Sequence, residues 1–405
     1  MRDETRELLD EMRLYANGNL EYEFIDPSAS TDEAKREAVY RQLTQKGLYP
    51  TTLETQTKEG SKQMYIFPGA IITYKNMDHA LLLLKDQLGA DQETMINNSI
   101  RNLEYELIRS IKNVTTIVPP QIVFLEGQGE LNDKRTADIF NTLMPYCGVK
   151  RERIDGKLDA LKNTNLVIIA KPDSVFAEKD KYIIDQFVMN GGKVLWLIDQ
   201  MNITMDSLAD NNETYALPYQ LNIDDMLFRY GVRINYDIAA DMQAVPIPVK
   251  TGNFIGNQPE IKRLPWVYFP LLFPTSEHPI VNNLNAVKTE FVNTIDTLQS
   301  DEIKKTVLLT TSRYTQVRNS PVVVSLEAMH KKPDYRLYNQ QYKPVAVLLE
   351  GTFTSNFKNR LPEAIINSPE LKFTEKSKPT KMIVVSDGDI IKNDYRKSND
   401  MILPL

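Results

Sequence analysis

Five charged residues follow short apolar segments of the sequence, where their side chains could bind a ligand. They are Glu126, Lys171, Asp199, Glu350 and Asp387. If each apolar segment is a buried parallel strand, the strands gather these side chains along one edge of a sheet, where open α/β sheets place their ligands. The sequence therefore predicts an acidic cleft at that edge, and Asp389 is a further candidate beside Asp387.

A simpler interpretation of the same acids stays open. Carboxylates that follow strands often cap helices or form turns, because their oxygens accept hydrogen bonds from nearby backbone N–H groups. Asp199 and Asp387 fit that role as well as a binding role. Replacing Glu126 and Asp199 together should abolish binding of any ligand in the cleft.

The turn Glu-Gly-Gln-Gly-Glu-Leu at 126–131 stands between the first apolar segment and a predicted helix, where a phosphate-binding turn would lie. Its spacing does not fit a dinucleotide fingerprint, because Asn132 stands where a third small residue is needed. Glu126 and Glu130 would also repel a pyrophosphate. Gln128 and Glu130 are therefore kept as candidate ligand-binding residues, without a nucleotide or any other cofactor.

Other chemistries find little support in the sequence. The single Cys147 allows neither an internal disulfide nor a cysteine zinc site, and His79, His278 and His330 are isolated. There is no Gly-x-Ser-x-Gly elbow and no Walker A motif. The net charge of −6 gives no positive field for nucleic acid. The chain is predicted to be neither an enzyme nor a metalloprotein, and not to bind nucleic acid.

The elements that must position these residues begin near residue 118. Six short apolar runs suit strands buried on both faces, and amphipathic helices lie between several of them. The runs are 122–125, 166–170, 194–198, 307–309, 345–349 and 382–385. This pattern predicts a flavodoxin-like, doubly wound and mostly parallel α/β domain over 118–405. The segment 243–264 is rich in Pro, Gly and Asn and is expected to form an excursion or lid.

Residues 1–117 are predicted to form a smaller α/β domain. Alternation over 20–24 indicates a strand, Pro68-Gly69 indicates a hairpin, and apolar spacing over 91–112 indicates one long closing helix. The order of these elements is like a thioredoxin-type layout, although no Cys-x-x-Cys is present. The pair Pro119-Pro120 marks the predicted boundary.

Particular strings, rather than composition, carry a resemblance to a known family. They are Glu4–Arg13, Tyr22–Pro27, Phe124–Leu131, Leu348–Arg360 and Val385–Asp394. Five separated strings in this order resemble the GldG family of gliding-motility ABC transporter auxiliary proteins. That family commonly has a His where this sequence has Gln128, so the turn here is a weaker candidate for metal or acid–base chemistry.

The resemblance implies a non-catalytic accessory subunit with a ligand- or partner-binding GIFT domain from about residue 118. It implies a periplasmic location, anchoring in the inner membrane through segments absent from this chain, and work with the permease GldF and the ATPase GldA. A role in gliding, in protein secretion or in both stays open, as does a homodimer. Two alternatives also stay open: a glycan hydrolase using carboxylates such as Glu126 and Asp387, and a free-standing solute-binding protein with two lobes.

Overall fold

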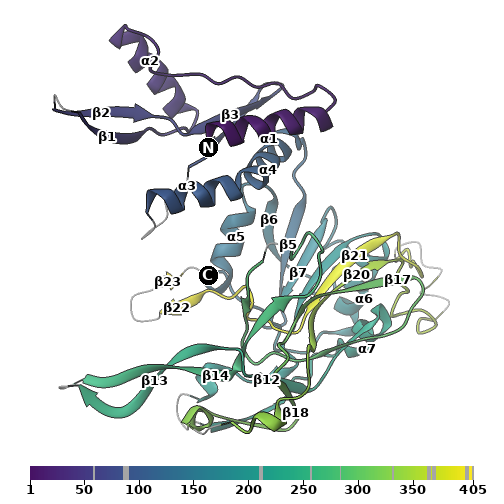
Figure 1. The fold of residues 1–405 in the computed structure, drawn as a ribbon. Coiled ribbons are helices and arrows are strands. Elements are labelled where there is room, and N and C mark those ends of the chain that lie inside the picture. Colours follow the sequence, from purple (N-terminus) through teal and green to yellow (C-terminus); the bar gives the residue numbers. More distant parts are fainter. Residues whose placement is uncertain are drawn as a thin grey trace. The chain divides into compact units, whose positions relative to one another are not determined.

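The computed structural model describes residues 1–57, 60–84, 91–208, 213–255, 258–282, 284–330, 333–362, 366, 371–396 and 401–403 (Figure 1). The chain divides into two compact units, 1–119 and 120–405, and each is described by itself. In the described residues, none of the helices combines the length and the apolar character that crossing a bilayer requires.

The first unit consists of helices and two separate hairpins. Its helices are α1 (Arg2–Tyr15), α2 (Glu33–Gln45), α3 (Gln92–Arg101) and α4 (Leu103–Thr115). Strand β1 (Thr51–Thr57) pairs with β2 (Gly60–Ile66), and β3 (Gly69–Tyr74) pairs with β4 (Met77–Leu82), both antiparallel. The prediction of a hairpin across Pro68-Gly69 was therefore wrong, because those residues join the two hairpins. The described residues do not reproduce the predicted thioredoxin-type strand order.

The strand predicted over 20–24 was also wrong, and side-chain contacts explain the alternation that suggested it. The Tyr22 hydroxyl donates to Asp10 of α1 at 2.6 Å. The guanidinium groups of Arg2 and Arg6 lie 5.2 and 5.3 Å from the centre of the Phe24 ring. Tyr22 and Phe24 thus both contact α1, but the backbone of this segment joins no sheet.

The predicted long helix over 91–112 is two helices separated at Asn102. Asp91 caps α3 by accepting a hydrogen bond from the backbone N–H of Thr94 at 2.7 Å. In α4, Leu103 and Leu107 are buried and pack in one cluster with Leu81 of β4. The prediction of helical structure in this segment was confirmed, but the first helix ends at Asn102, and asparagine is a weak helix former.

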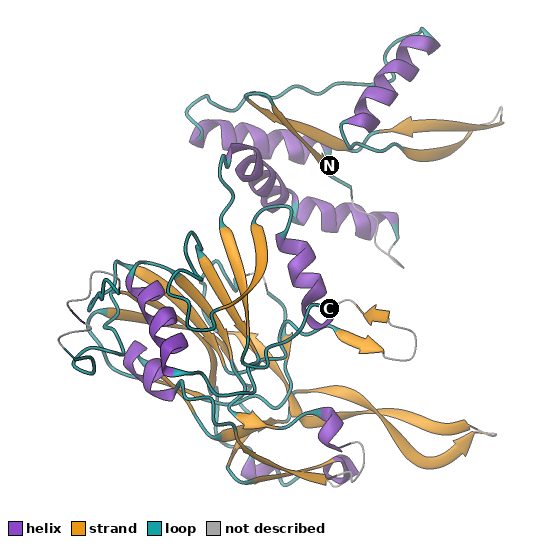
Figure 2. Cartoon of the chain, turned by 180° about the vertical axis from the view of Figure 1, so that it is seen from behind, coloured by secondary structure: helices purple, strands orange, loops and turns teal. Residues whose placement is uncertain are grey.

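The second unit is built on a mixed sheet in the order β13-β14-β17-β20-β21-β8-β7-β5-β6, with β15 paired to β14 (Figures 1 and 2). Five neighbouring strands are parallel: β21 (Thr380–Val385), β8 (Lys193–Leu197), β7 (Leu166–Ala170), β5 (Gln121–Glu126) and β6 (Gly148–Arg153). The others pair antiparallel: β20 (Pro344–Gly351), β17 (Ile303–Thr310), β14 (Gln258–Pro274), β13 (Ala244–Ile255) and β15 (Val287–Lys288).

All six predicted apolar runs are strands of this sheet, but the sheet is not mostly parallel. A run buried on both faces has the same apolar composition whichever way its strand points, so the pattern cannot give direction. The expected architecture is thus corrected to a mixed α/β sheet. The predicted excursion at 243–264 falls largely within the hairpin of β13 and β14, which extends from the sheet (Figure 1).

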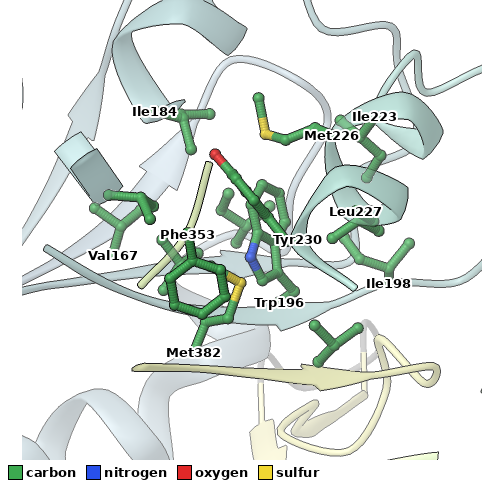
Figure 3. Close-up of a cluster of buried hydrophobic side chains, with 14 of the residues drawn as sticks. Val167, Ile184, Trp196, Ile198, Ile223, Met226, Leu227, Tyr230, Phe353 and Met382 are labelled. Atoms are coloured by element: carbon green, nitrogen blue, oxygen red, sulfur yellow. The ribbon is translucent and has the colours of Figure 1, made fainter. Parts of the chain in front are cut away.

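Two apolar clusters cover the two faces of the sheet. On one face, α6 (Glu178–Met189) and α7 (Asp224–Tyr230) pack their apolar side chains around the fully buried Trp196 of β8 (Figure 3). On the other face, α5 (Ala137–Leu143) packs against Ile122 and Phe124 of β5. Neighbouring residues of β5 point to opposite faces, so this strand contributes Val123 and Leu125 to the first cluster and Ile122 and Phe124 to the second.

The remaining strands of this unit are short, and some of them pack in a third apolar cluster with Trp266 of β14. They are β9 (Met201–Asn202), β10 (Glu213–Pro218), β11 (Val232–Ile234), β12 (Asp237–Asp241), β16 (Ile295–Thr297), β18 (Thr315–Asn319), β19 (Val322–Ser325), β22 (Asp394–Arg396) and β23 (Met401–Leu403). Only some of these strands contribute to the cluster: β9, β10, β12 and β19 do, together with β13 and β14.

Candidate functional site

A buried lysine lies at the carboxyl edge of the parallel strands, between two aspartates. Lys171 follows β7, Asp199 follows β8, and Asp389 follows β21, and these three strands are neighbours in the sheet. The Lys171 ammonium contacts the carboxylates of both Asp199 and Asp389. The side chains are 12%, 5% and 4% exposed, so the pairs lie within the protein rather than at an open surface.

The backbone after β21 holds these carboxylates in place. The N–H of Gly388 donates to Asp199 Oδ1, and the N–H of Asp389 donates to Asp387 Oδ1 at 2.6 Å. The N–H of Glu290 donates to the other oxygen of Asp387 at 2.9 Å. A Cβ atom on Gly388 would lie 2.5 Å from the Cβ of Lys171, so glycine is required for this close approach.

A second lysine continues the alternation of charge. Lys392 Nζ lies 2.5 Å from Asp389 Oδ1 and 2.9 Å from Glu290 Oε2. Lys288 Nζ lies 3.1 Å from the other oxygen of Glu290. We call Lys171, Asp199, Asp387, Asp389, Lys392, Glu290 and Lys288 the ion-pair cluster. It holds three ammonium groups against four carboxyl groups.

The pKa values of the cluster follow from burial and from these contacts. Burial lowers the pKa of Lys171, but Asp199 and Asp389 outweigh it and hold that pKa well above the ordinary lysine value. Burial likewise raises the pKa of Asp389, yet Lys171 and Lys392 bring it below its usual range. Burial, together with its acidic neighbours, raises the pKa of Asp387 well above the ordinary value. A protonated Asp387 would bring the cluster to charge balance.

The predicted acidic cleft is therefore filled by its own counter-ions. Oxygen atoms of Asp199, Asp387 and Asp389 lie within 4.8 Å of one another, a spacing that suits a bound cation. The ammonium of Lys171 already supplies positive charge between two of them. The arrangement acts chemically as an internal salt-bridge network, and the binding of an external ligand there stays a prediction.

The turn at 126–131 is fixed by its own hydrogen bonds. Glu126 pairs with Arg151 at 3.0 Å. The buried Gln128 donates from its backbone to Glu130 at 2.8 Å and from its side chain to Asp180 at 3.3 Å. Burial raises the pKa of Glu130. These contacts fasten the turn to β6 and α6, and a ligand role for Gln128 and Glu130 also stays a prediction.

Comparison with known proteins places most of the chain in one family. A family model described as an ABC-type uncharacterized transport system matches residues 119–404. The chain belongs to this family of ABC-type transport auxiliary proteins. A second model, a domain of unknown function, matches residues 1–73. No curated protein matches the chain significantly.

Among solved structures, the mmIFT52 N-terminal domain is similar to this chain at 13% identity. The match covers 67% of this chain and 88% of that one, with a TM-score of 0.38. The transport auxiliary family model spans the whole ion-pair cluster and every candidate residue named from the sequence.

One candidate of this auxiliary protein lies away from the others. Glu350 lies next to the last residue of β20, which runs antiparallel to β21. It pairs across the sheet with Lys381 near the beginning of β21. Its carboxylate lies 3.2 Å from the Lys381 ammonium. The expectation that Glu350 joins Asp387 at one edge was wrong, because it assumed that both strands run in the same direction.

Three cluster members were missed in the sequence. Lys392 stands three residues after Asp389, a spacing that brings side chains together where the chain turns helically, and this signal was available. Lys288 ends β15 and Glu290 lies in the irregular segment after it, and no pattern in the sequence connects either residue to β21.

Proposed function

We propose that this chain is a non-catalytic, extracytoplasmic accessory subunit of a gliding-motility-associated ABC transporter. It binds a partner protein or ligand and couples that event to the permease GldF and the ATPase GldA. We further propose that it acts in the periplasm and is held at the inner membrane by segments outside residues 1–405. The observation that carries the proposal is the match of residues 119–404 to the transport auxiliary family.

The chemistry of the carboxyl edge speaks against the alternative of a glycan hydrolase. A carboxylate pair that hydrolyses glycosides needs one protonated and one ionised group, both facing the substrate. Asp387 is fully buried and accepts two backbone hydrogen bonds, while Glu126 is paired with Arg151. Both residues thus hold their own fold together.

Co-purification from membranes tests the proposal. The full-length, anchored protein carrying an affinity tag is solubilised in mild detergent, and the eluate is probed for the permease and the ATPase. We expect both subunits in the eluate, and neither when an unrelated inner-membrane protein carries the tag. Their absence from an eluate in which the tagged protein is folded, as judged by its thermal transition, would contradict the proposal.

A further inference from the structure

A pocket of about 900 Å³ lies at the other end of the parallel strands. It is lined by α7, β11, the residues that follow β16, and the segment after β20. Ile303 in its wall pairs with Gly351, which in turn pairs with Thr380, the first residue of β21. The ion-pair cluster follows the last residue of β21, so the two sites lie at opposite ends of the strands. The volume is within the range of known ligand pockets.

Three arginines line this pocket, and two of them already hold carboxylates. Arg360 lies 2.6 Å from Asp225, and Arg233 contacts Asp296 at 2.5 Å. Asp225 is also paired with Lys181 at 2.8 Å. Burial raises the pKa of Asp225, but its hydrogen bonds to Asn356, Lys181 and Arg360 bring it well below the ordinary value. Arg360 and Arg233 therefore already have carboxylate partners within the chain and need no ligand to neutralise them.

The third arginine differs, because the guanidinium of Arg229 has no ion-pair or hydrogen-bond partner within the part of the chain that the structure describes. The remaining carboxylate of the pocket, Asp224, accepts a hydrogen bond from Gln200 at 2.9 Å. One guanidinium is thus left over in a protein whose net charge is −6. A guanidinium binds a carboxylate through two parallel hydrogen bonds, which a lysine cannot match.

Apolar side chains line the same pocket as this guanidinium. Phe228 precedes Arg229 in α7 and is 56% exposed, and Tyr236, which follows β11, is 44% exposed. Leu298 and Ile303 add aliphatic surface to the wall. Partly exposed aromatic rings and a free arginine in one pocket offer contact area and charge to the same ligand.

We propose that this pocket binds an extended peptide segment of a partner protein, in which an acidic residue adjoins an aromatic or aliphatic one. Arg229 takes the carboxylate, and Phe228 and Tyr236 cover the apolar neighbour. The partly exposed rings of Phe228 and Tyr236 favour a peptide, because a ligand that covers them continues past the pocket. Small-molecule sites, in contrast, enclose most of their ligand. The inference rests on the proposed function for the nature of the partner.

Peptide binding to the purified chain tests this inference. The probes are four fluorescein-labelled hexapeptides in which Asp or Glu follows Phe or Leu, together with their Asn and Gln counterparts. Fluorescence anisotropy should give saturable binding of at least one acidic peptide, with a Kd between about 1 μM and 1 mM. Its amide counterpart should bind about tenfold more weakly or worse, because the charged hydrogen bonds are lost.

The matched variants are Arg229→Gln and Arg313→Gln. Arg313 also stands beside an exposed ring, that of Tyr314, but it is not part of the pocket. We expect about a tenfold loss with Arg229→Gln and an unchanged Kd with Arg313→Gln.

Four results would overturn the inference: no acidic peptide binding below about 1 mM, equal binding of the amide peptides, equal binding to Arg229→Gln, or free 3-phenylpropionate binding as tightly as the best peptide. Because the assay uses this chain alone, each of these results leaves the co-purification test of the proposed function unaffected.

Discussion

The two sites, at opposite ends of the strands of the large sheet, use the same kinds of charged residue in opposite ways. At the carboxyl edge, Lys171 and Lys392 are surrounded by carboxylates, and nearly all of this charge is buried. At the other edge, arginines and aspartates line an open pocket, and Arg229 is left without a partner among the described residues. A charged residue after a strand is therefore not evidence of a binding site until its neighbours in space are known.

This difference has an energetic side. Buried ion pairs stabilise a fold weakly compared with apolar packing, but removing one partner is costly because the other charge stays buried and uncompensated. An exposed charge can be removed at almost no cost. Substitutions at the two edges should therefore separate stability from binding.

The largest effect is expected for Lys171→Met. Removing the ammonium leaves Asp199 and Asp389 facing each other inside the protein, which should lower the free energy of unfolding by about 3–5 kcal/mol. Urea denaturation followed by circular dichroism measures the change. A loss below about 1 kcal/mol would mean that the cluster is hydrated and no different from a surface ion pair.

A smaller loss is expected for Gly388→Ala. The added Cβ would meet the Cα of Lys171 at 2.9 Å as well as its side chain, so the backbone after β21 must shift. We expect about 1–3 kcal/mol of destabilisation, as for other overpacked sites. Gly18→Ala is not a clean control for space, despite its open surroundings, because the positive φ of Gly18 adds strain. The comparison is therefore made with Ala16→Gly at the half-buried C-terminal cap of α1.

The pH dependence of stability should reveal the raised pKa of Asp387. Its folded pKa is raised, so the folded state keeps a proton that the unfolded chain has lost above about pH 4. Stability from this group therefore falls as pH rises from the unfolded toward the folded pKa, by up to about 1.4 kcal/mol per pH unit. Urea titrations at about pH 5, 6 and 7 should show a flatter profile for Asp387→Asn than for the natural chain. Parallel profiles would contradict the assigned protonation.

The smallest effects are expected at exposed charges. Lys381→Met breaks the pair with Glu350, in which the lysine is 53% exposed, and should cost less than about 1 kcal/mol. Arg229→Gln should change stability by less than about 0.5 kcal/mol while it weakens peptide binding. Thermal unfolding of both variants checks this, and a large loss for Arg229→Gln would show that the residue has a structural partner.

The sequence predicted the elements of the second unit better than their arrangement. The six apolar runs correspond to strands of the structure because burial is a local property of the chain. Strand direction is not local, and for that reason Glu350 was assigned to the wrong edge. In the first unit, the alternation at Tyr22 and Phe24 came from contacts with α1. A period of two in the sequence cannot distinguish such contacts from those of a strand.

For the candidate site, too, the sequence predicted some features and not others. Lys171, Asp199, Asp387 and Asp389 could be brought together from the sequence, because three parallel strands carry them to one edge. That they neutralise one another could not be predicted, since it depends on distances between side chains. The pocket around Arg229 was missed, because it joins α7 to segments about 70 and 130 residues further along the chain.

The two outermost strands of the large sheet have a consequence for association between copies. Strand β6, at one end, carries Lys150, Arg151, Glu152 and Arg153 in succession, and β13, at the other end, carries Pro246 and Pro248. Charged side chains and prolines on border strands discourage the addition of a further strand from another molecule. The sheet is thereby protected against open-ended aggregation, which matters for any protein that works at high local concentration.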